Sequence, residues 1–574
     1  MSPARAAPPR PLERDPGVRA ATSASPESRT SNGTGRALVP LLVGALALAP
    51  AISMLVIVQG GNPMQWLDYW DVLPRVTNSD GSFAPRGMFE YQNEHPVAIP
   101  ALIYWVNAHL TGGSNVALGT LVVAIVAAQV AILGWALPRR ITTVFAWRAA
   151  FVAVAAALLF ATRGTHNFLL AMSGTAWLTA NLFAIIALFV AWRRGPLLAL
   201  PFAALASLSY GTGLAVWPVL VLLAVLERRP RWLVAATAGA TVVAAGAYLL
   251  GYEAPDQVAQ EDRTLVGFAS RICEVLGSPF TENLDLAGML GAGLLGLTGF
   301  AVWSAWRRGV LADVAPWIGL GAYALLGAAF ISISRSGGAV ENSTSSRYVS
   351  LGALAWLATL VLVAAVFPAR PVAVAGAAVA AVVALVGGHA TIEEIRALRF
   401  ESDAIATALR LGAVPDPNYV YFNDDAVAIL PRLDHYPFND DYDLDCGLLG
   451  ERLDPATLDR TIDQGGPPVT EGWLDGYVTS EFTGVARVSG WAGTSRDIRC
   501  ILLVDGRGEV VGTATHGVDR PDLRGATHFQ AWGFTGVARQ PPLDETLRAV
   551  VLLEGDHPPV VLQGRLSGAD VPTG

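Results

Sequence analysis

The sequence predicts a polytopic α-helical membrane protein of about eleven membrane segments, followed by an extracytoplasmic α/β linker region and a small β-sandwich. Hydrophobic residues make up 53% of the 574 residues and charged residues only 15%, against about a quarter in ordinary soluble domains. Long apolar runs recur between residues 37 and 390, and Arg residues gather at every second boundary between them. From about residue 484 the runs become short, β-rich and separated by turn residues.

Charge divides the chain into unlike parts. Residues 1–36 are rich in Pro, Ser, Arg and Gly and predict a disordered cytoplasmic tail, because so little apolar surface cannot offset the entropy of ordering. The chain has a net charge of -8, and all 39 basic residues are Arg. Residues 391–574 contain fifteen Arg and twenty-nine acidic residues, a net charge of -14. This balance argues against a nucleic-acid-binding protein.

The apolar runs predict a membrane domain over residues 37–390 with a large external loop at 60–113. Arg clusters between alternate runs predict a cytoplasmic N-terminus and an extracytoplasmic C-terminal region. The runs occupy residues 37–59, 114–137, 144–162, 168–192, 196–226, 233–252, 286–306, 314–333, 348–366 and 371–388.

The run 196–226 has two interpretations, because Arg pairs flank it on both sides. One long tilted helix would place Arg228, Arg229 and Arg231 outside and invert the later topology. A hairpin with its turn at Ser-Tyr-Gly-Thr-Gly (209–213) keeps both ends inside and brings the number of segments to eleven. We expect the hairpin.

Residues 391–470 predict a helical or mixed extracytoplasmic region, and residues 471–574 predict the β-sandwich. Cys446 and Cys500 both fall outside the membrane, where they would form either a disulfide or two buried thiols. The tryptophans of the β-rich part would pack in its core or stack on sugar rings. We prefer a carbohydrate-binding or acceptor-positioning module for this part.

The external loop 60–113 contains the most informative residues. The sequence has no phosphate-binding G-x-x-x-x-G-K-[ST] loop and no H-E-x-x-H motif. The loop instead concentrates acids and a histidine among aromatic residues: Asp68, Asp71, Glu90, Glu94 and His95. On a helix, Asp68 and Asp71 share one face. Carboxylates close to hydrocarbon are costly, and they tend to mark a pathway or a reaction centre.

This arrangement resembles the GT-C superfamily of polyprenyl-phosphate-dependent glycosyltransferases over residues 37–390. The resemblance rests on the single span before the loop, on Trp66 and Asp68, on Asn-Glu-His (93–95), on the many later spans and on the exported C-terminal region. The loop acid matches the catalytic position of the family, although Asp-Tyr-Trp-Asp is not the adjacent acidic pair of several members. Either Asp68 or Asp71 could therefore take that role.

The resemblance implies an inverting sugar transfer from a polyprenyl-phosphate donor to a glycan, glycolipid or protein acceptor at the outer membrane face. Asp68, Asp71 and Glu94 are the catalytic candidates, with Asp68 the favoured general base. Arginines would stabilise the departing phosphate. The substrate-binding candidates are Glu90, His95, Arg163, His166, Arg271, Arg335, Arg347 and Tyr348. We expect no required metal, although the carboxylates could hold a divalent cation through water.

A non-catalytic alternative is a transporter or flippase for a lipid-linked sugar, or a scaffold for envelope assembly. A transporter is expected to show paired interrupted spans in corresponding halves of the chain. The sequence shows one interruption, at 209–213, and its external acids cluster in one loop. Both features favour an enzyme.

Overall fold

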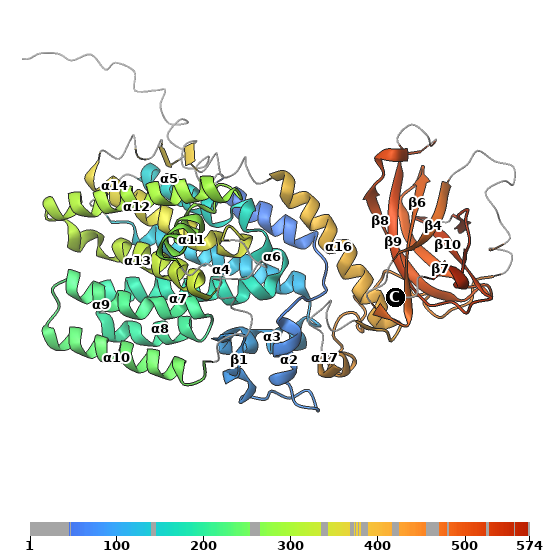
Figure 1. Cartoon of the computed structure of the whole chain (residues 1–574), viewed down its shortest axis with the longest axis horizontal. Helices are drawn as coiled ribbons and strands as arrows, with labels where there is room; N and C mark the ends of the chain where they lie inside the picture. Colours follow the sequence, from blue (N-terminus) through green and yellow to red (C-terminus); the bar gives the residue numbers. More distant parts are fainter. Residues whose placement is uncertain are drawn as a thin grey trace, which may run out of the picture.

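The computed structural model consists of a helical bundle, a long connecting helix and a β domain (Figure 1). The structure describes residues 48–138, 145–252, 264–334, 343–367, 388–415, 424–454, 470–478, 482–523, 529–555 and 557–571, with a few single positions between them. The predicted tail 1–36, Arg335 and most of the run 371–388 lie outside the described residues.

Six described helices are long and apolar enough to cross a membrane. They correspond to helices α4 (Asn115–Ala136), α7 (Ala171–Arg194), α10 (Arg231–Leu249), α12 (Leu284–Arg307), α13 (Leu311–Ser334) and α14 (Val349–Val366). Four more apolar helices are shorter, namely Leu48–Gln59, Arg148–Leu159 within α5 (Phe145–Leu159), Pro196–Ser207 and Gly211–Leu226. The membrane character is thus supported, but fewer described helices reach spanning length than the eleven segments that the sequence predicts.

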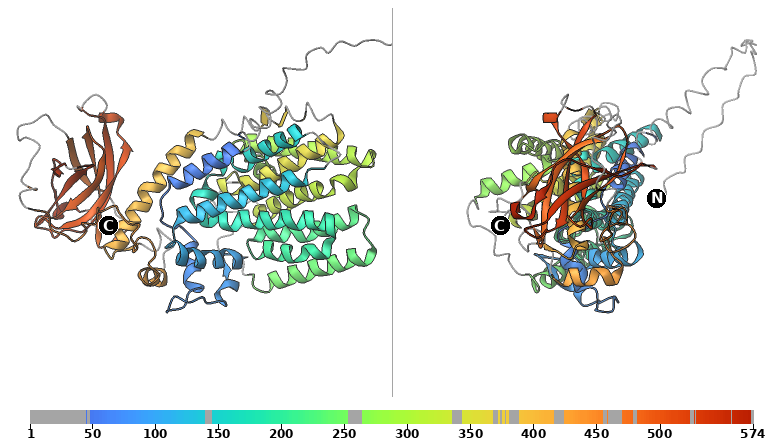
Figure 2. Two further views of the ribbon diagram at one scale, coloured as in Figure 1. Left: turned by 180° about the vertical axis from the view of Figure 1, so that it is seen from behind. Right: turned by 90° about the vertical axis from the view of Figure 1, so that its right-hand side faces the viewer.

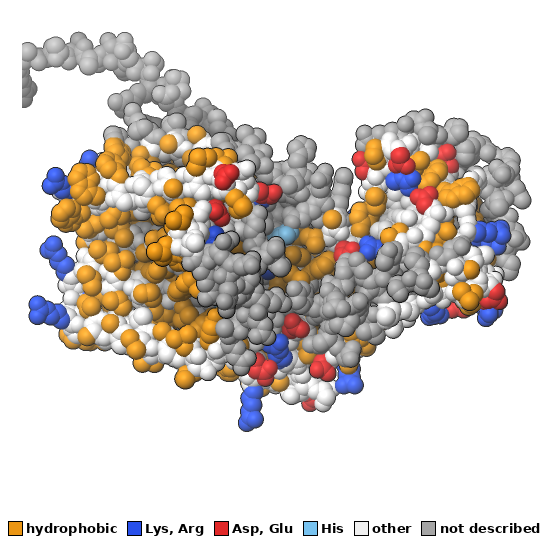
Figure 3. All heavy atoms as spheres, in the orientation of Figure 1, with side chains coloured by type: hydrophobic (Ala, Val, Ile, Leu, Met, Phe, Trp, Pro, Cys, Tyr) orange, Lys and Arg blue, Asp and Glu red, His pale blue; other side chains and the backbone are white. Residues whose placement is uncertain are grey.

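The burial of the candidate spans shows which of them lie inside the bundle. Of an apolar stretch of 18 residues in α7, 78% is buried, whereas in the corresponding stretch of α10 only 6% is buried. Exposed apolar side chains such as Val242 and Val243 on α10 leave that helix suited to a lipid environment. Basic side chains project from the end of the bundle that lies farthest from the β domain (Figure 3), where α7 ends with Arg193 and Arg194.

The run 196–226 forms the predicted hairpin. Its arms are α8 (Leu200–Ser207) and α9 (Val216–Leu226), joined through the 3-10 helix η4 (Gly211–Ala215). At the Arg-rich ends, the Arg229 guanidinium donates to the Trp192 carbonyl oxygen at 3.2 Å. Since the two ends of the run lie together, the alternative of one long helix is wrong.

The loop 60–113 folds into short elements beside the bundle (Figure 1). Helix α2 (Tyr69–Arg75) is followed by the 3-10 helix η1 (Gly87–Phe89), by strands β1 (Tyr91–Gln92) and β2 (His95–Pro96), and by helix α3 (Ala98–Leu110). The two strands pair antiparallel through a turn at Asn93, whose φ of 52° is in the left-handed region that Asn tolerates. Helix α11 (Leu265–Gly277) packs separately against α12.

Helix α16 (Gly388–Arg410) connects the bundle to the β domain, as two opposite views show (Figures 1 and 2). Strand β3 (Val414–Pro415) pairs with β5 (Phe482–Thr483). Helix α17 (Asp424–Ile429) lies next to α2 and continues into the 3-10 helix η6 (Leu430–Leu433). The chain therefore returns to the loop 60–113 before it enters the β domain.

The β domain is one nearly closed antiparallel sheet. Its strands run in the order β11, β10, β7, β8, β9, β6 and β4, with β12 paired to β10. Their bounds are β4 (Thr470–Val478), β6 (Val485–Thr494), β7 (Ile498–Val504), β8 (Val510–Asp519), β9 (Ala531–Arg539), β10 (Thr546–Leu553), β11 (Val560–Val561) and β12 (Leu566–Ser567).

Closure of this sheet corrects the predicted β-sandwich. A parallel bridge joins Trp473 of β4 to Gln563, just beyond β11, so the two ends of the sheet meet. One curled sheet encloses the core, and the predicted pair of stacked sheets is absent from the described strands. The short alternating runs predicted the strands correctly, but they did not specify closure. Cys446 and Cys500 form a disulfide, which is consistent with an extracytoplasmic location.

Candidate functional site

The two loop aspartates lie on one face at the start of α2. Asp68 occupies the N-cap position and Asp71 lies one turn later, as their spacing predicts. Tyr69, Trp70, Val72 and Leu73 bury the other faces and leave both carboxylates half-buried. The buried Gln92 amide of β1 donates to Asp68 Oδ1 at 3.2 Å and to Asp71 Oδ2 at 3.1 Å.

Electrostatics favours the neutral form of Asp71 more than in a free side chain. Burial raises the pKa of Asp71, and the neighbouring Asp68 charge raises it further, whereas Gln92 and Arg75 act in the opposite direction. A carboxylate that binds a proton more tightly than usual is better suited to accept one from a substrate hydroxyl. Asp71 thus has the acid–base property that a general base needs.

Glu94 and His95 form the second part of the site with Tyr248 of α10. The Glu94 side chain is buried, and its Oε2 lies 3.9 Å from His95 Nε2. His95 Nδ1 lies 2.7 Å from the Tyr248 hydroxyl, which donates to the Glu94 carbonyl oxygen at 3.0 Å. Tyr248 therefore ties the β1–β2 turn to the end of a candidate span.

The turn of the hairpin 196–226 lies directly beside His95. A Cβ added to Gly211 would lie 2.4 Å from His95 Nδ1 and 2.9 Å from the Tyr248 hydroxyl, so only Gly allows this close approach. Ring contacts then lead into the bundle. The centroid distances are 4.5 Å from His95 to Tyr210, 4.2 Å from Tyr210 to Trp177 and 5.3 Å from Trp177 to Tyr348.

Most of the remaining substrate-binding candidates gather near Tyr348. Arg163 pairs with Glu282 and donates to the Thr344 carbonyl oxygen at 2.7 Å. The neighbouring Asn167 amide donates to the Arg347 carbonyl oxygen at 3.1 Å. The backbone N–H of His166 donates to Ser346 Oγ at 3.2 Å. These contacts bring Arg163, His166, Arg347 and Tyr348 together, although they lie far apart in the sequence.

Two other candidates are not brought into these groups by the described contacts. Glu90 is exposed where η1 ends, and Arg271 lies half-buried on α11. Arg335 lies outside the described residues. In the described part of the chain, no group of three or more His, Cys, Asp or Glu side chains is placed to hold a metal ion.

His435 is a site residue that the sequence did not indicate. It is fully buried, its Nε2 lies 3.2 Å from the Tyr69 hydroxyl, and its Nδ1 lies 2.7 Å from the Tyr436 carbonyl oxygen. A protonated Nδ1 donates to that carbonyl and leaves Nε2 to accept from Tyr69. Burial lowers the pKa of His435 to about 4. The neutral imidazole thus holds the first residue of α2.

Gln92, Tyr248, Tyr210 and Gly211 were also missed as site residues. The motif 209–213 predicted a turn, but the sequence did not reveal which residue of the loop 60–113 that turn contacts. Tyr248 lay within a predicted membrane segment, where an aromatic residue near the end of a helix usually suggests only an interfacial anchor. The contact of each residue with a distant part of the chain makes it part of the site.

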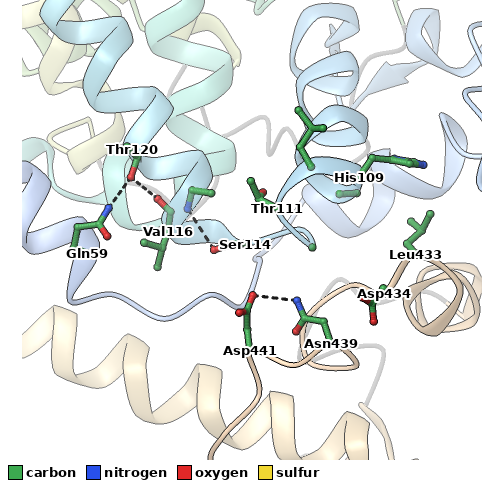
Figure 4. A pocket seen from close by; sticks show the side chains of 14 residues that line it. Gln59, His109, Thr111, Ser114, Val116, Thr120, Leu433, Asp434, Asn439 and Asp441 are labelled. Atoms are coloured by element: carbon green, nitrogen blue, oxygen red, sulfur yellow. Dashed lines mark hydrogen bonds between the residues drawn. The ribbon is translucent and has the colours of Figure 1, made fainter.

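A pocket of about 740 Å³ opens at the C-terminal end of α3 (Figure 4). Gln59 and Thr120 lie on one side of it, and Asn439 and Asp441 lie on another. The Gln59 amide donates to Thr120 Oγ1 at 2.9 Å, and the Asn439 amide donates to Asp441 Oδ2 at 3.2 Å. Other lining residues come from the α3–α4 connection and from the segment after η6.

The chain matches no family model, no curated protein and no solved structure. A functional conclusion therefore depends on the chemistry of the site.

Proposed function

We propose that this protein is an integral-membrane glycosyltransferase that uses a polyprenyl-phosphate sugar as donor. The observation that carries the proposal is the half-buried pair Asp68 and Asp71, which share the Gln92 amide at the edge of an apolar helical bundle. A general base in such a position can act on a substrate that a lipid tail holds in the bilayer. The acceptor is a cell-envelope glycan, glycolipid or exported protein on the outer face.

In the proposed reaction, the acceptor hydroxyl gives its proton to Asp68 as its oxygen bonds to the anomeric carbon of the donor sugar. The bond from that carbon to the phosphate oxygen breaks, and its electron pair leaves with the phosphate. Polyprenyl phosphate is released, and the anomeric configuration is inverted. Asp71 shares the Gln92 amide with Asp68 and is the alternative base.

The remaining site residues would bind the substrates in this reaction. Glu94 and His95 orient hydroxyl groups of the donor or acceptor, because they follow Gln92, which pairs with His95 across the turn and whose amide donates to both aspartates. Arg163 and Arg347 supply positive charge for the leaving phosphate. The loop 344–348 holds the two arginines close together. Its carbonyl oxygens accept hydrogen bonds from the Arg163 side chain and from the Asn167 amide. The reaction as written requires no metal ion.

Replacement of Asp68 tests the proposal. We expect Asp68→Asn to lower the release of polyprenyl phosphate from a polyprenyl-phosphate sugar by about 10²- to 10⁴-fold, the usual effect of losing a general base. The smaller effect of Asp71→Asn would then identify Asp71 as the supporting carboxylate. Asp80→Asn is the matched control, because Asp80 is an exposed acid of the same loop that bonds only locally to Ser82.

Two results would contradict the assignment. Full turnover by both the Asp68→Asn and the Asp71→Asn proteins would exclude the aspartate pair as the base. Movement of an intact lipid-linked sugar across vesicles by the wild-type protein, with no polyprenyl phosphate released, would favour the flippase alternative. The interrupted hairpin at 209–213 is the feature that such a transporter would use.

A further inference from the structure

The pocket at the C-terminal end of α3 combines three segments that are far apart in the sequence. Gln59 ends the first described helix, Ala117 and Thr120 lie on the first turns of α4, and Asp434 and Asp441 follow η6. Its volume of about 740 Å³ falls within the range of small-molecule sites, about 300 to 1,000 Å³. The pocket lies beside the predicted outer ends of two membrane segments.

The backbone of the α3–α4 connection is shaped to leave room for this lining. Gly112 has a φ of 54°, and a Cβ there would lie 2.4 Å from Asn439 Nδ2. A residue other than Gly would therefore push the Asn439 amide away. Asn439 lines the pocket, and its Nδ2 donates to Asp441 Oδ2 at 3.2 Å, so the amide orients a carboxylate of the lining.

The lining indicates the chemical class of the ligand. Asp434 and Asp441 contribute carboxylates, and no Arg lines the pocket within the described part of the chain, so a phosphate or another anion would be repelled. Hydroxyl and amide groups of Thr111, Thr120 and Gln59 offer hydrogen bonds. The apolar lining side chains can contact the C–H face of a sugar ring, and they include Val116 and Leu433.

We propose that this pocket binds a neutral sugar unit of a glycan, with the Asp441 carboxylate, which the Asn439 amide orients, accepting hydrogen bonds from its hydroxyl groups. Helix α3 joins the pocket to the Glu94–His95 turn and, at 13 residues with a rise of about 1.5 Å each, separates the two by roughly 20 Å. A glycan of several sugar units could span this distance. The role of the pocket as an acceptor subsite rests on the proposed function, whereas sugar binding by itself does not.

Protection from chemical labelling tests the binding without any need for turnover. The reporter is Ala117→Cys in a Cys273→Ser background, since the other two cysteines are joined in a disulfide. The full chain in detergent reacts with a water-soluble maleimide in the presence of trisaccharides of glucose, galactose, mannose or arabinose. We expect at least one of them to slow labelling about threefold at twice its dissociation constant, because a third of the sites are then empty.

Variants connect this protection to the proposed contacts. Asn439→Leu should abolish the protection, and Asp440→Asn, a change in an exposed neighbour that does not line the pocket, should leave it intact. Protection by none of the neutral sugars, or equal protection in Asn439→Leu, would overturn the proposal. Stronger protection by choline than by any sugar would show a cation site instead and would also overturn it.

The acceptor role has a separate readout. In the polyprenyl-phosphate release assay, Asn439→Leu should raise the KM for the acceptor about tenfold, which corresponds to the loss of about 1.4 kcal/mol, with kcat unchanged. An unchanged acceptor KM alongside lost protection would leave a sugar site that does not serve the acceptor, and would overturn the subsite role. If the wild-type protein has no turnover, the proposed function fails, but the labelling experiment still decides whether the pocket binds sugar.

Discussion

At the scale of single residues, Gly211 shows how one missing side chain shapes the candidate site. Its position allows His95 Nδ1 to approach the hairpin turn and to reach the Tyr248 hydroxyl at 2.7 Å. The same hydroxyl bonds to the Glu94 backbone, so the orientations of Glu94 and His95 are linked. A Cβ at residue 211 would have to displace one of these groups.

We therefore expect Gly211→Ala to reduce turnover about tenfold or more, because a misplacement of about 1 Å in a catalytic site can cost two orders of magnitude. The polyprenyl-phosphate release assay measures this effect. Gly239→Ala on α10 is the matched control, since a Cβ there meets nothing within 4 Å. Equal loss in the two variants would mean that the space beside His95 is unimportant.

At the scale of elements, α2 is held by parts of the chain that come before and after the candidate spans. Gln92 of β1 bonds both aspartates, and His435 receives the Tyr69 hydroxyl on the opposite side. Trp70 also packs against His435 with a centroid distance of 5.4 Å. A helix of seven residues is too short to be stable alone, so these contacts decide its position.

The depressed pKa of His435 predicts a loss of stability in acid. The unfolded chain takes up a proton near pH 6.5, whereas the folded protein resists protonation down to about pH 4. The contribution of His435 to stability is therefore complete above pH 6.5 and is lost as the pH decreases toward 4. At pH 5 the loss amounts to about 2 kcal/mol, from roughly one and a half pKa units.

His435→Gln, which keeps an acceptor for Tyr69 but cannot be protonated, should remove this part of the pH dependence. The measurement is the midpoint temperature of unfolding at pH 7.5 and at pH 5, compared with His557→Gln at an exposed histidine. If wild type and His435→Gln lose the same stability between these pH values, His435 does not remain neutral in the folded protein.

At the scale of the whole molecule, α16 joins the bundle to the barrel, which is the nearly closed sheet of the β domain. One contact at this junction is a buried carboxyl group. Asp403 on α16 accepts hydrogen bonds from Asn62 at the start of the loop 60–113 and from Thr515 of β8, the latter at 2.7 Å. Thr407 and Glu401 add contacts from the same helix to the barrel. Apolar contacts accompany these polar ones, because Val485 and Val537 of the barrel belong to the same buried cluster as Ile405 and Ala408 of α16.

The pH dependence of this junction should have the opposite sign. Burial raises the pKa of Asp403 from 3.8 to about 6, although the hydrogen bonds and Arg399 favour the charged form and Asp443 disfavours it. The folded state then binds this proton more tightly than the unfolded chain, so the contribution of Asp403 to stability is lost as the pH rises from about 4 to 6. About two pKa units correspond to roughly 3 kcal/mol.

Asp403→Asn should therefore gain stability relative to wild type as the pH rises across this window. Differential scanning calorimetry at pH 4.5 and pH 7 measures the difference, and Asp440→Asn, at an exposed acid that does not act on Asp403, is the control. A gap between wild type and Asp403→Asn that is independent of pH would show that Asp403 is charged throughout.

Whether the sequence predicts a feature of the fold depends on how far apart in the chain the interacting residues lie. Apolar run lengths and Arg positions predicted the helices and the hairpin 196–226, because insertion into a bilayer follows local composition. The i, i+3 spacing of Asp68 and Asp71 predicted their shared face for the same reason. The strands were predicted as well, but closure of the sheet depends on the bridge between Trp473 and Gln563, which no local pattern encodes.

The sequence by itself determined that this is an apolar, helix-rich chain with an acidic C-terminal region and a cluster of acids in its first large loop. Only the tertiary structure decided which residues surround those acids. Gly211, Tyr248 and His435 reach the loop from three distant segments, and each does so through close packing or a buried hydrogen bond. Such contacts depend on the meeting of whole elements, which the periodicity of one element cannot specify.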